Sequence, residues 1–248
     1  MYTKLAHLYD WTGVVDFSID IADIIQQTAA QHGITMPGPL LDLGCGTGET
    51  ACLLAKAGWQ VIGVDWAEAM LDEARRKVAE AGISQNIKLN VGDIRNTRLS
   101  KPVPMVYCVY DTVNHMLVAP DLEALFASAH RNLPPGGVFL FDVNTEANFL
   151  KFWQGKDKDE GPNVQLSFEA SYDVERGRAV VAIQAAEHTE SQLVMTQELV
   201  TEQYWNDETL RATLTGCGFE VTGCTPFNPS TLELEDMHLK TLWVCKKG

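Results

Sequence analysis

Three glycines and an acid near residue 40 have the types and spacing of a ligand-binding turn. The stretch LLDLGCGTGET, residues 40–50, spaces Gly44, Gly46 and Gly48 two residues apart, with Asp42 two positions before the first. Glycine-rich turns between a strand and a helix commonly hold a phosphate on their backbone N–H groups. The carboxylate of Asp42 would repel a phosphate, so this turn favours a ligand that brings a positive charge.

The spacing also separates this turn from the dinucleotide fingerprint. That fingerprint runs G-x-G-x-x-G, whereas the glycines here lie one residue closer together. S-adenosylmethionine has no phosphate, and it carries a positive α-ammonium group and a positive sulfonium group. It is therefore the ligand that the acid and the three glycines favour.

Two more acids and an aromatic residue follow the next predicted strands. Asp65 ends the second strand, where an acid can bind both hydroxyls of a ribose. Trp66 offers a ring face to an adenine, and Asp93 could accept from the adenine amine. Each has a structural alternative, a turn or capping residue for the acids and packing for Trp66. Their shared place at the carboxyl ends of consecutive strands favours a ligand crevice.

The elements that must position these residues alternate between strand and helix from about residue 40. Strands are predicted at PLLDLG, WQVIGVDW, NIKLNVGDI, MVYCVYD and GVFLFDVN, and helices at ETACLLAKAG, AEAMLDEARRKVAEAG and DLEALFASAHRNL. This order predicts an α/β fold with a parallel, doubly wound sheet and helices on both faces.

After residue 145 the pattern changes to alternating segments with no clear helix. Residues 146–205 contain such segments around the turn-like ERGR, which predicts antiparallel strands. A helix in NDETLRATL, capped by Asn206 or Asp207, and a strand at KTLWVCKK then return to the core. We expect one domain over residues 1–248, with an inserted antiparallel β subdomain over 146–205.

Composition limits the classes of function. The chain has 248 residues, of which 46% are hydrophobic, and a net charge of −14. That charge argues against a nucleic-acid partner, because neutralising phosphates needs clustered Lys and Arg. The six cysteines show no CxxC and no zinc spacing, so no metal is expected.

The sequence shows no targeting or membrane segment. The first residues lack the pattern of a secretory signal, and no apolar stretch reaches the roughly 18 residues of a membrane span. We therefore expect a cytoplasmic protein with no membrane partner. A homodimer is possible on this sequence.

These motifs together resemble those of the class I S-adenosylmethionine-dependent methyltransferases. LLDLGCGTGET is similar to their first motif, VIGVDWAEAMLDEAR to the second and VGDIRN to the third, while YCVYDTVNHM and LPPGGVFLFDVN resemble the fourth and fifth. The resemblance is close over about residues 36–145. It implies a Rossmann-like, seven-stranded sheet with the β insertion after the fifth strand and a last strand, KTLWVCKK, inserted antiparallel.

The same resemblance implies where the cofactor binds. Gly44, Gly46 and Gly48 would line the methionine part, Asp65 would hold the ribose, and Asp93 and Ile94 would contact the adenine. The cofactor site expected as a whole comprises Asp42, Gly44, Cys45, Gly46, Gly48, Asp65, Trp66, Met70, Gly92, Asp93, Ile94 and Tyr110.

The methyl acceptor is expected beyond the fourth strand. The (D/N)PP(Y/F) pattern of relatives that methylate nucleic-acid amines is absent, and YDTVNHM resembles a subgroup that methylates small molecules, including amino-sugar N,N-dimethyltransferases. His115 is the candidate base, or the residue that orients the acceptor, unless it only bonds the backbone. The expected acceptor contacts are Asp111, Asn114 and Tyr9, although the first two could simply cap the turn.

By analogy with that subgroup, the 146–205 insert would cover the acceptor pocket and LAHLYDWTG would close over the cofactor. The expected function is transfer of a methyl group from S-adenosylmethionine to a nitrogen or oxygen of a small molecule, by in-line displacement. Two alternatives stay open, a protein or tRNA methyltransferase and a cofactor-binding regulatory protein without transfer activity.

Overall fold

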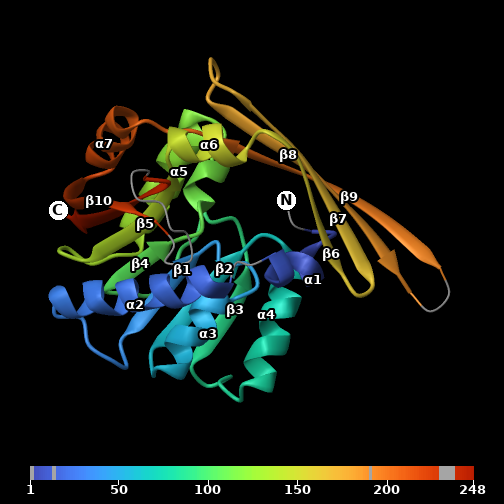
Figure 1. Cartoon of the computed structure of the whole chain (residues 1–248). Helices are drawn as coiled ribbons and strands as arrows, with labels where there is room; N and C mark the ends of the chain where they lie inside the picture. The colour runs from blue at the N-terminus through green and yellow to red at the C-terminus, as the bar shows by residue number, and fades with distance from the viewer. Residues whose placement is uncertain (1–2, 13–14, 190–191, 229–237) are drawn as a thin grey trace.

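The computed structural model describes residues 3–12, 15–189, 192–228 and 238–248. Figure 1 shows a central sheet with helices on both faces and a second, smaller sheet that leans against one side of it. No helix within these ranges is both long and apolar enough to cross a membrane.

The central sheet has seven strands in the order β10-β11-β5-β4-β1-β2-β3. Five of them pair with one another in parallel, and they are β1 (Pro39–Leu43), β2 (Gln60–Asp65), β3 (Ile87–Val91), β4 (Met105–Cys108) and β5 (Val138–Asn144). The last strand, β11 (Lys240–Lys247), pairs antiparallel with both β5 and β10 (Phe219–Phe227). The parallel, doubly wound sheet and its antiparallel last strand are therefore confirmed.

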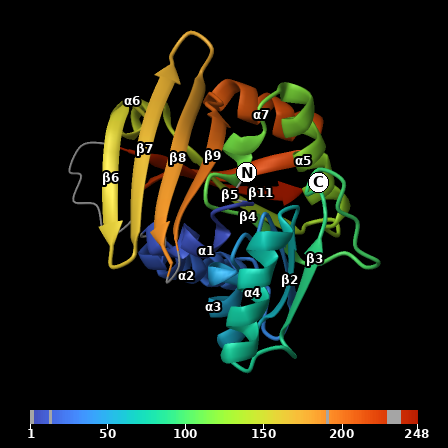
Figure 2. The same ribbon diagram turned by 90° about the vertical axis from the view of Figure 1, so that its right-hand side faces the viewer.

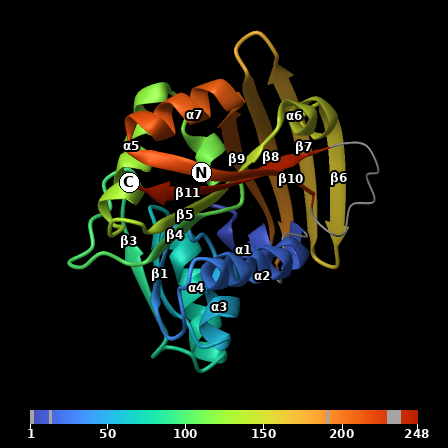
Figure 3. The same ribbon diagram turned by 90° about the vertical axis from the view of Figure 1, so that its left-hand side faces the viewer.

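Helices cover both faces of this sheet, as Figure 3 shows. One face carries α2 (Val15–Gln31), α3 (Glu49–Lys56) and α4 (Glu68–Glu80), and the other carries α5 (Ala119–Arg131) and α7 (Asp207–Gly216). The sequence patterns predict all of these except α2. The Asn206 side chain caps α7 by accepting from Thr209 N at 2.8 Å, which is one of the two caps considered.

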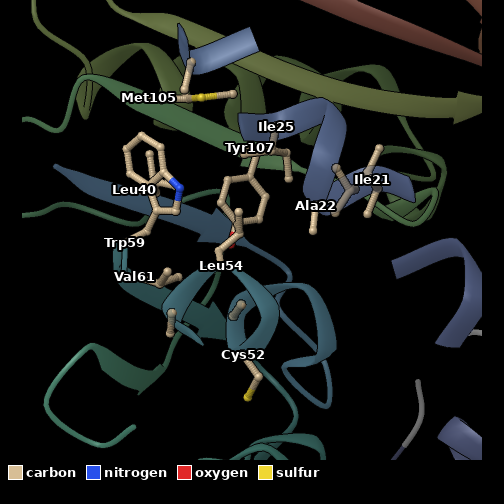
Figure 4. Packing of buried hydrophobic residues seen from close by; sticks show 14 of the residues in the cluster. Ile21, Ala22, Ile25, Leu40, Cys52, Leu54, Trp59, Val61, Met105 and Tyr107 are labelled. Atoms are coloured by element: carbon tan, nitrogen blue, oxygen red, sulfur yellow. The ribbon is translucent and has the colours of Figure 1, made fainter. Parts of the chain in front are cut away.

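Buried side chains fill both layers between sheet and helices. On one face Ile21 and Ile25 of α2 and Leu54 of α3 pack around Leu40 and Tyr107 (Figure 4). On the other face the cluster joins α5, α7 and the sheet through Leu122, Phe126, Leu210, Phe139 and Trp243. Each fully buried Leu, Ile or Phe contributes about 1.5–3 kcal/mol, so these layers hold the carboxyl ends of the strands firmly in place.

The insert begins with a helix, which the sequence pattern does not predict. Thr145 caps α6 (Glu146–Phe152) by accepting from Asn148 N, and Phe149 is the buried residue that anchors it. Four antiparallel strands follow in the order β6-β7-β8-β9. They are β6 (Gly155–Gly161), β7 (Val164–Asp173), β8 (Arg178–His188) and β9 (Leu193–Gln203). Figure 2 shows them side by side, beside the central sheet.

Residues 3–12, here called the N-terminal strap, connect the insert to the core. The strap contains α1 (Ala6–Tyr9) and η1 (Asp10–Thr12). The Glu198 carboxylate of β9 accepts hydrogen bonds from the backbone N–H groups of Thr3, Lys4 and Leu5, at 2.7, 3.2 and 3.2 Å. At its other end the strap is held to α4, where Lys77 Nζ lies 2.5 Å from Asp10 Oδ2.

Candidate active site

A cavity of about 320 Å³ lies at the carboxyl ends of β1 to β4, under the N-terminal strap. Its described lining carries six carboxylates and one guanidinium, the side chains of Asp10, Asp42, Glu49, Asp65, Asp93, Asp121 and Arg95. A cavity with this excess of negative charge disfavours a diphosphate and suits a cationic ligand.

The glycine turn forms the floor of this cavity. Gly44 has φ +87°, and a Cβ there would lie 2.5 Å from Thr112 Cγ2, so only glycine fits. Gly46 lines the cavity, together with Cys45. Gly48 does not line it, because its Cα faces α4, where a Cβ would lie 3.0 Å from Ala74 Cβ. The expected contact of Gly48 with the methionine part is thus replaced by close helix packing.

Asp65 holds the turn and also lines the cavity. One carboxylate oxygen accepts from Gly46 N at 2.9 Å and the other from Ala67 N at 2.9 Å. Burial raises the pKa of Asp65, and these two N–H groups oppose the shift. Asp65 therefore stabilises the turn and also faces the crevice, so the two roles considered for it are compatible.

Asp42 supplies a direct test of whether the residues present fit S-adenosylmethionine. It is 2% exposed and lines the cavity, and its Oδ1 receives no hydrogen bond from the described residues. Burial raises the pKa of Asp42 to about 8, the Tyr107 hydroxyl opposes this shift and the charge of Asp65 adds to it. An ammonium group would supply Oδ1 with a donor and the buried acid with a counter-charge, so the residues fit the cofactor that the sequence predicts.

The change Asp42→Asn is expected to alter the pH dependence of stability. The pKa of Asp42 rises on folding from 3.8 to about 8, so its stabilising contribution is full below about pH 4 and lost as pH rises through 8. Without ligand, the variant should be more stable than the parent at pH 9, by about 1 kcal/mol or more. Urea denaturation at pH 5 and 9 measures this, with the exposed Asp23→Asn as the matched control. Equal pH dependence in variant and parent would contradict the assignment.

The far end of the cavity carries the residues expected at the adenine. Trp66 is 61% exposed, so it is not a packing residue, and it lines the cavity with Ile94. Both Asp93 oxygens are bonded by Arg95, which lowers the pKa of Asp93, and Arg95 also reaches Asp121 at 2.7 Å.

Met70 and Gly92, both expected at the cofactor, differ in whether they line the cavity. Met70 is buried at 3% exposure and lines the cavity. Gly92 lies outside the lining, and its N–H donates to the Asp65 carbonyl at 2.8 Å. Gly92 therefore extends the pairing of β2 with β3, and its expected cofactor contact is not found.

A second cavity of about 280 Å³ lies between the strap and the inner face of the insert. Its lining consists of Leu5, Leu8, Tyr9, Tyr110, Asp111, Trp153, Leu166, Phe168, Val181, Ile183 and Glu202. Tyr9 and Tyr110 line both cavities, so the two spaces meet at these rings. Three strands of the insert contribute to the wall of this second cavity.

The chain between the cavities is held in an uncommon conformation. Tyr110 and Asp111 are non-glycine residues with φ values of +61° and +50°. The Tyr110 hydroxyl bonds that of Ser18, and Asp111 N donates to Asp142 Oδ2 at 3.1 Å. Residues in this region of φ cost about 1–3 kcal/mol each and cluster at functional sites.

His115 and Asn114 lie together on η2 (Thr112–His115) but have different roles. His115 lines the first cavity, its Nδ1 lies 3.3 Å from the Thr201 carbonyl oxygen, and burial lowers its pKa. Asn114 is fully buried and lines neither cavity. Its amide donates to the Gln203 carbonyl and accepts from Asn144 N, both at 2.9 Å. The expected acceptor contact of Asn114 is therefore a structural tie between η2, β5 and β9.

The sequence patterns miss a buried ionic cluster beside the second cavity. Lys240 Nζ lies 2.7 Å from Asp111 Oδ1 and 2.9 Å from Asp142 Oδ2. Glu202 lies in the same cluster and is 1% exposed. A signal existed for Asp142, which interrupts the apolar run GVFLFDVN on the fully buried strand β5. Within the described residues, no group of three or more His, Cys, Asp or Glu side chains could hold a metal ion.

Comparison with known proteins agrees with this geometry. Residues 40–137 match the family model described as a methyltransferase domain. A solved S-adenosylmethionine-dependent methyltransferase from Clostridium acetobutylicum ATCC 824 superposes with a TM-score of 0.83 at 22% identity, over 100% of this chain and 99% of that one. Residues 40–137 thus match a methyltransferase domain, and the whole chain shares the fold of the solved neighbour, which is the fold that the sequence motifs predict.

Two curated relatives match about half of this chain. A protein of Bacillus subtilis (strain 168) that is named as a methyltransferase, YqeM, is 38% identical over 127 residues, 50% of each chain. The dTDP-3-amino-3,4,6-trideoxy-alpha-D-glucopyranose N,N-dimethyltransferase of Streptomyces venezuelae is 29% identical over 123 residues, 50% of this chain and 47% of that one. The chain spans about half the length of the curated relatives it matches.

Proposed function

We propose that this protein transfers a methyl group from S-adenosylmethionine to an amine nitrogen of a small molecule. The observation that carries the proposal is the pair of cavities that meet at Tyr9 and Tyr110. One cavity has the glycine turn and acidic lining that suit the cofactor, and the other is a mostly apolar space for an acceptor. The S. venezuelae relative, named for N,N-dimethylation of an amino sugar, supports a nitrogen acceptor.

When bound, the cofactor supplies an electrophilic methyl group: the acceptor lone pair forms the new bond to carbon while sulfur keeps the electron pair of the broken bond. Most of the acceleration of such a displacement comes from alignment and from exclusion of water. The strap and the insert exclude water here, because they supply Leu5, Leu8, Leu166 and Phe168 around the second cavity. Tyr9 and Tyr110 form the boundary that both reactants would contact.

His115 would take the proton that the amine must lose. In the tautomer that donates from Nδ1–H to the Thr201 carbonyl, the basic lone pair is on Nε2. Because burial lowers the pKa of His115, the ring is neutral near pH 7 and can accept a proton.

The change His115→Ala is expected to lower kcat about 100-fold, the usual size of general-base catalysis, and to weaken cofactor binding far less, although the ring lines the cofactor cavity. In the parent, kcat should fall as pH drops through the lowered pKa of His115, and the variant should lose this dependence. Initial rates across pH and calorimetry with S-adenosylhomocysteine measure both effects. His188→Ala, at an exposed position, is the control. A collapse of cofactor binding would instead place His115 in the cofactor site.

The proposal as a whole is tested by incubating the protein with S-adenosylmethionine and a panel of amines, hydroxy acids and amino sugars. Formation of S-adenosylhomocysteine that depends on an amine supports it. Cofactor binding without turnover of any acceptor would favour the regulatory alternative, and turnover of a protein or tRNA alone would favour a macromolecular acceptor.

We also propose that the reaction takes place in the cytoplasm. All six cysteines are free, and four of them are buried. Free thiols are the usual state in a reducing compartment. This proposal would fail if the protein from its own cells were recovered with disulfides.

A further inference from the structure

The second cavity has an unusual composition for a site that accepts a nucleotide-linked substrate. Its described lining is apolar apart from two tyrosines and the carboxyls of Asp111 and Glu202, and it includes no Lys, Arg or His. The nearest cation, Lys240, is already bonded to Asp111 and Asp142. Any ligand in this space therefore meets two acids and no available positive side chain.

Glu202 is the less satisfied of the two acids. Its Oε2 accepts from Asn144 Nδ2 at 2.9 Å, whereas Oε1 receives no hydrogen bond from a donor of the described residues. The carboxyl of Asp111 lies within hydrogen-bonding reach of Glu202. Two carboxyl groups in contact must share a proton or bind a donor that lies between them. An amine nitrogen carries the N–H groups that such a position requires.

The two acids also lie beside the junction of the two cavities. Burial, and then the charges of Asp111, Tyr110 and Glu202, raise the pKa of Tyr9, which lines both spaces. A nitrogen held by these acids would therefore lie next to the cofactor cavity.

We propose that the acceptor is an apolar amine without phosphate, whose nitrogen binds between Asp111 and Glu202 and whose apolar part lies against Leu8, Phe168 and Ile183. This inference rests on the proposed function, because it names the acceptor class of that same site. It departs from the S. venezuelae relative, whose name specifies a dTDP-linked sugar. A diphosphate placed against two buried acids would be repelled, with no cation in the lining to compensate it.

Proton release gives the proposal a specific signature. Burial, followed by the negative charge of Asp111, raises the pKa of Glu202, so the pair of acids retains a proton at neutral pH. An alkylamine is an ammonium ion in solution, and the proton between the acids must leave when this ion takes its place. Binding should then release about one proton per amine, which appears as a dependence of the binding enthalpy on the buffer.

Calorimetry with matched probes tests the inference on the full chain. Protein saturated with S-adenosylhomocysteine is titrated with 4-phenylbutylamine, with 4-phenylbutanol and with thymidine diphosphate. The amine should bind at least about tenfold tighter than the alcohol, because it adds a charge-assisted hydrogen bond. Thymidine diphosphate should not compete with the amine.

Two variants test whether Glu202 causes the preference for the amine. Glu202→Gln should weaken binding of the amine about tenfold, leave the alcohol unchanged and abolish proton release. Glu169→Gln, the same change at an exposed position of β7, is the matched control. Equal binding of amine and alcohol by the parent, or competition by thymidine diphosphate, overturns the inference whether or not the variant folds.

The titration of S-adenosylhomocysteine is measured first and separates this inference from the proposed function. If S-adenosylhomocysteine does not bind, the proposed function fails, and the amine titration of the ligand-free protein still decides whether the second cavity binds an amine. If it binds and the amine shows no preference, the inference alone fails.

Discussion

Replacing Lys240 by methionine is expected to lower the free energy of unfolding by about 3–5 kcal/mol, the usual cost of removing one partner from a buried ion pair. Lys240 is 8% exposed and neutralises both Asp111 and Asp142, and Asp142 is fully buried. Methionine fills similar volume but leaves these carboxyls without a cation. Since the cluster joins β5, β11 and the turn after β4, its loss should weaken the central sheet and the acceptor side together.

The loss of stability caused by replacing Lys240 should increase as pH rises. Without Lys240, the folded-state pKa values of Asp111 and Asp142 rise, so the variant loses stability as pH increases and recovers part of it near pH 4. Urea denaturation at pH 4 and pH 8 measures this change.

Two companion variants identify the cause. Lys246→Met, at an exposed position of the same strand, should change stability by less than about 0.5 kcal/mol. Adding Asp142→Asn to the Lys240 variant should restore part of the loss, because one uncompensated charge is removed. A loss below about 1 kcal/mol at pH 8 would mean that water or repacking already compensates the acids.

The central sheet could be predicted because its information is local. Apolar runs that end in glycine or acid mark β1, β2 and β5, and buried parallel strands require such runs. The turn after β1 could also be predicted, since Asp42 and the three glycines stand together in LLDLGCGTGET. The contact that requires glycine at position 44, with the distant Thr112 side chain, could not.

Residues whose role depends on distant partners could not be assigned from the sequence. Gly48 and Gly92 carry the spacing of cofactor residues, but Ala74 and Asp65 are their actual neighbours. Asn114 has the polarity of an acceptor contact, and its amide is used by Gln203 and Asn144. Spacing along the chain does not reveal which side of a turn a residue faces.

The insert and the strap were the least predictable parts for a related reason. The β6 segment GKDKDEG is almost wholly exposed, so it shows no apolar alternation, and its strand state comes from pairing with β7. Glu198 and Glu202 both face inward from β9, where Glu198 holds the strap and Glu202 lines the second cavity. Inward acids on an edge strand can be recognised only once the cavity that they face is known.

The change Asp65→Asn is expected to weaken binding of S-adenosylhomocysteine by about 10- to 100-fold. A carboxylate can accept from both ribose hydroxyls, and hydrogen bonds to a charged group contribute about 1.5–3 kcal/mol. Asparagine keeps one acceptor for the N–H groups of Gly46 and Ala67, so the turn should survive with a modest loss of stability. Asp65→Ala would remove both functions, and it should lose stability as well as affinity.

The comparison of these variants separates the two uses of Asp65. Calorimetry gives the affinity and urea denaturation gives the stability, and Asp72→Asn, an exposed acid on α4, controls for the change in net charge. If Asp65→Asn loses affinity while its stability stays near that of the parent, the carboxylate binds the ligand directly. If both variants lose stability and retain affinity, Asp65 serves the turn alone. The ribose would then have to be held by another acid of the same cavity, such as Asp10 on the strap, whose carboxylate accepts from Thr47 Oγ1 at 2.6 Å.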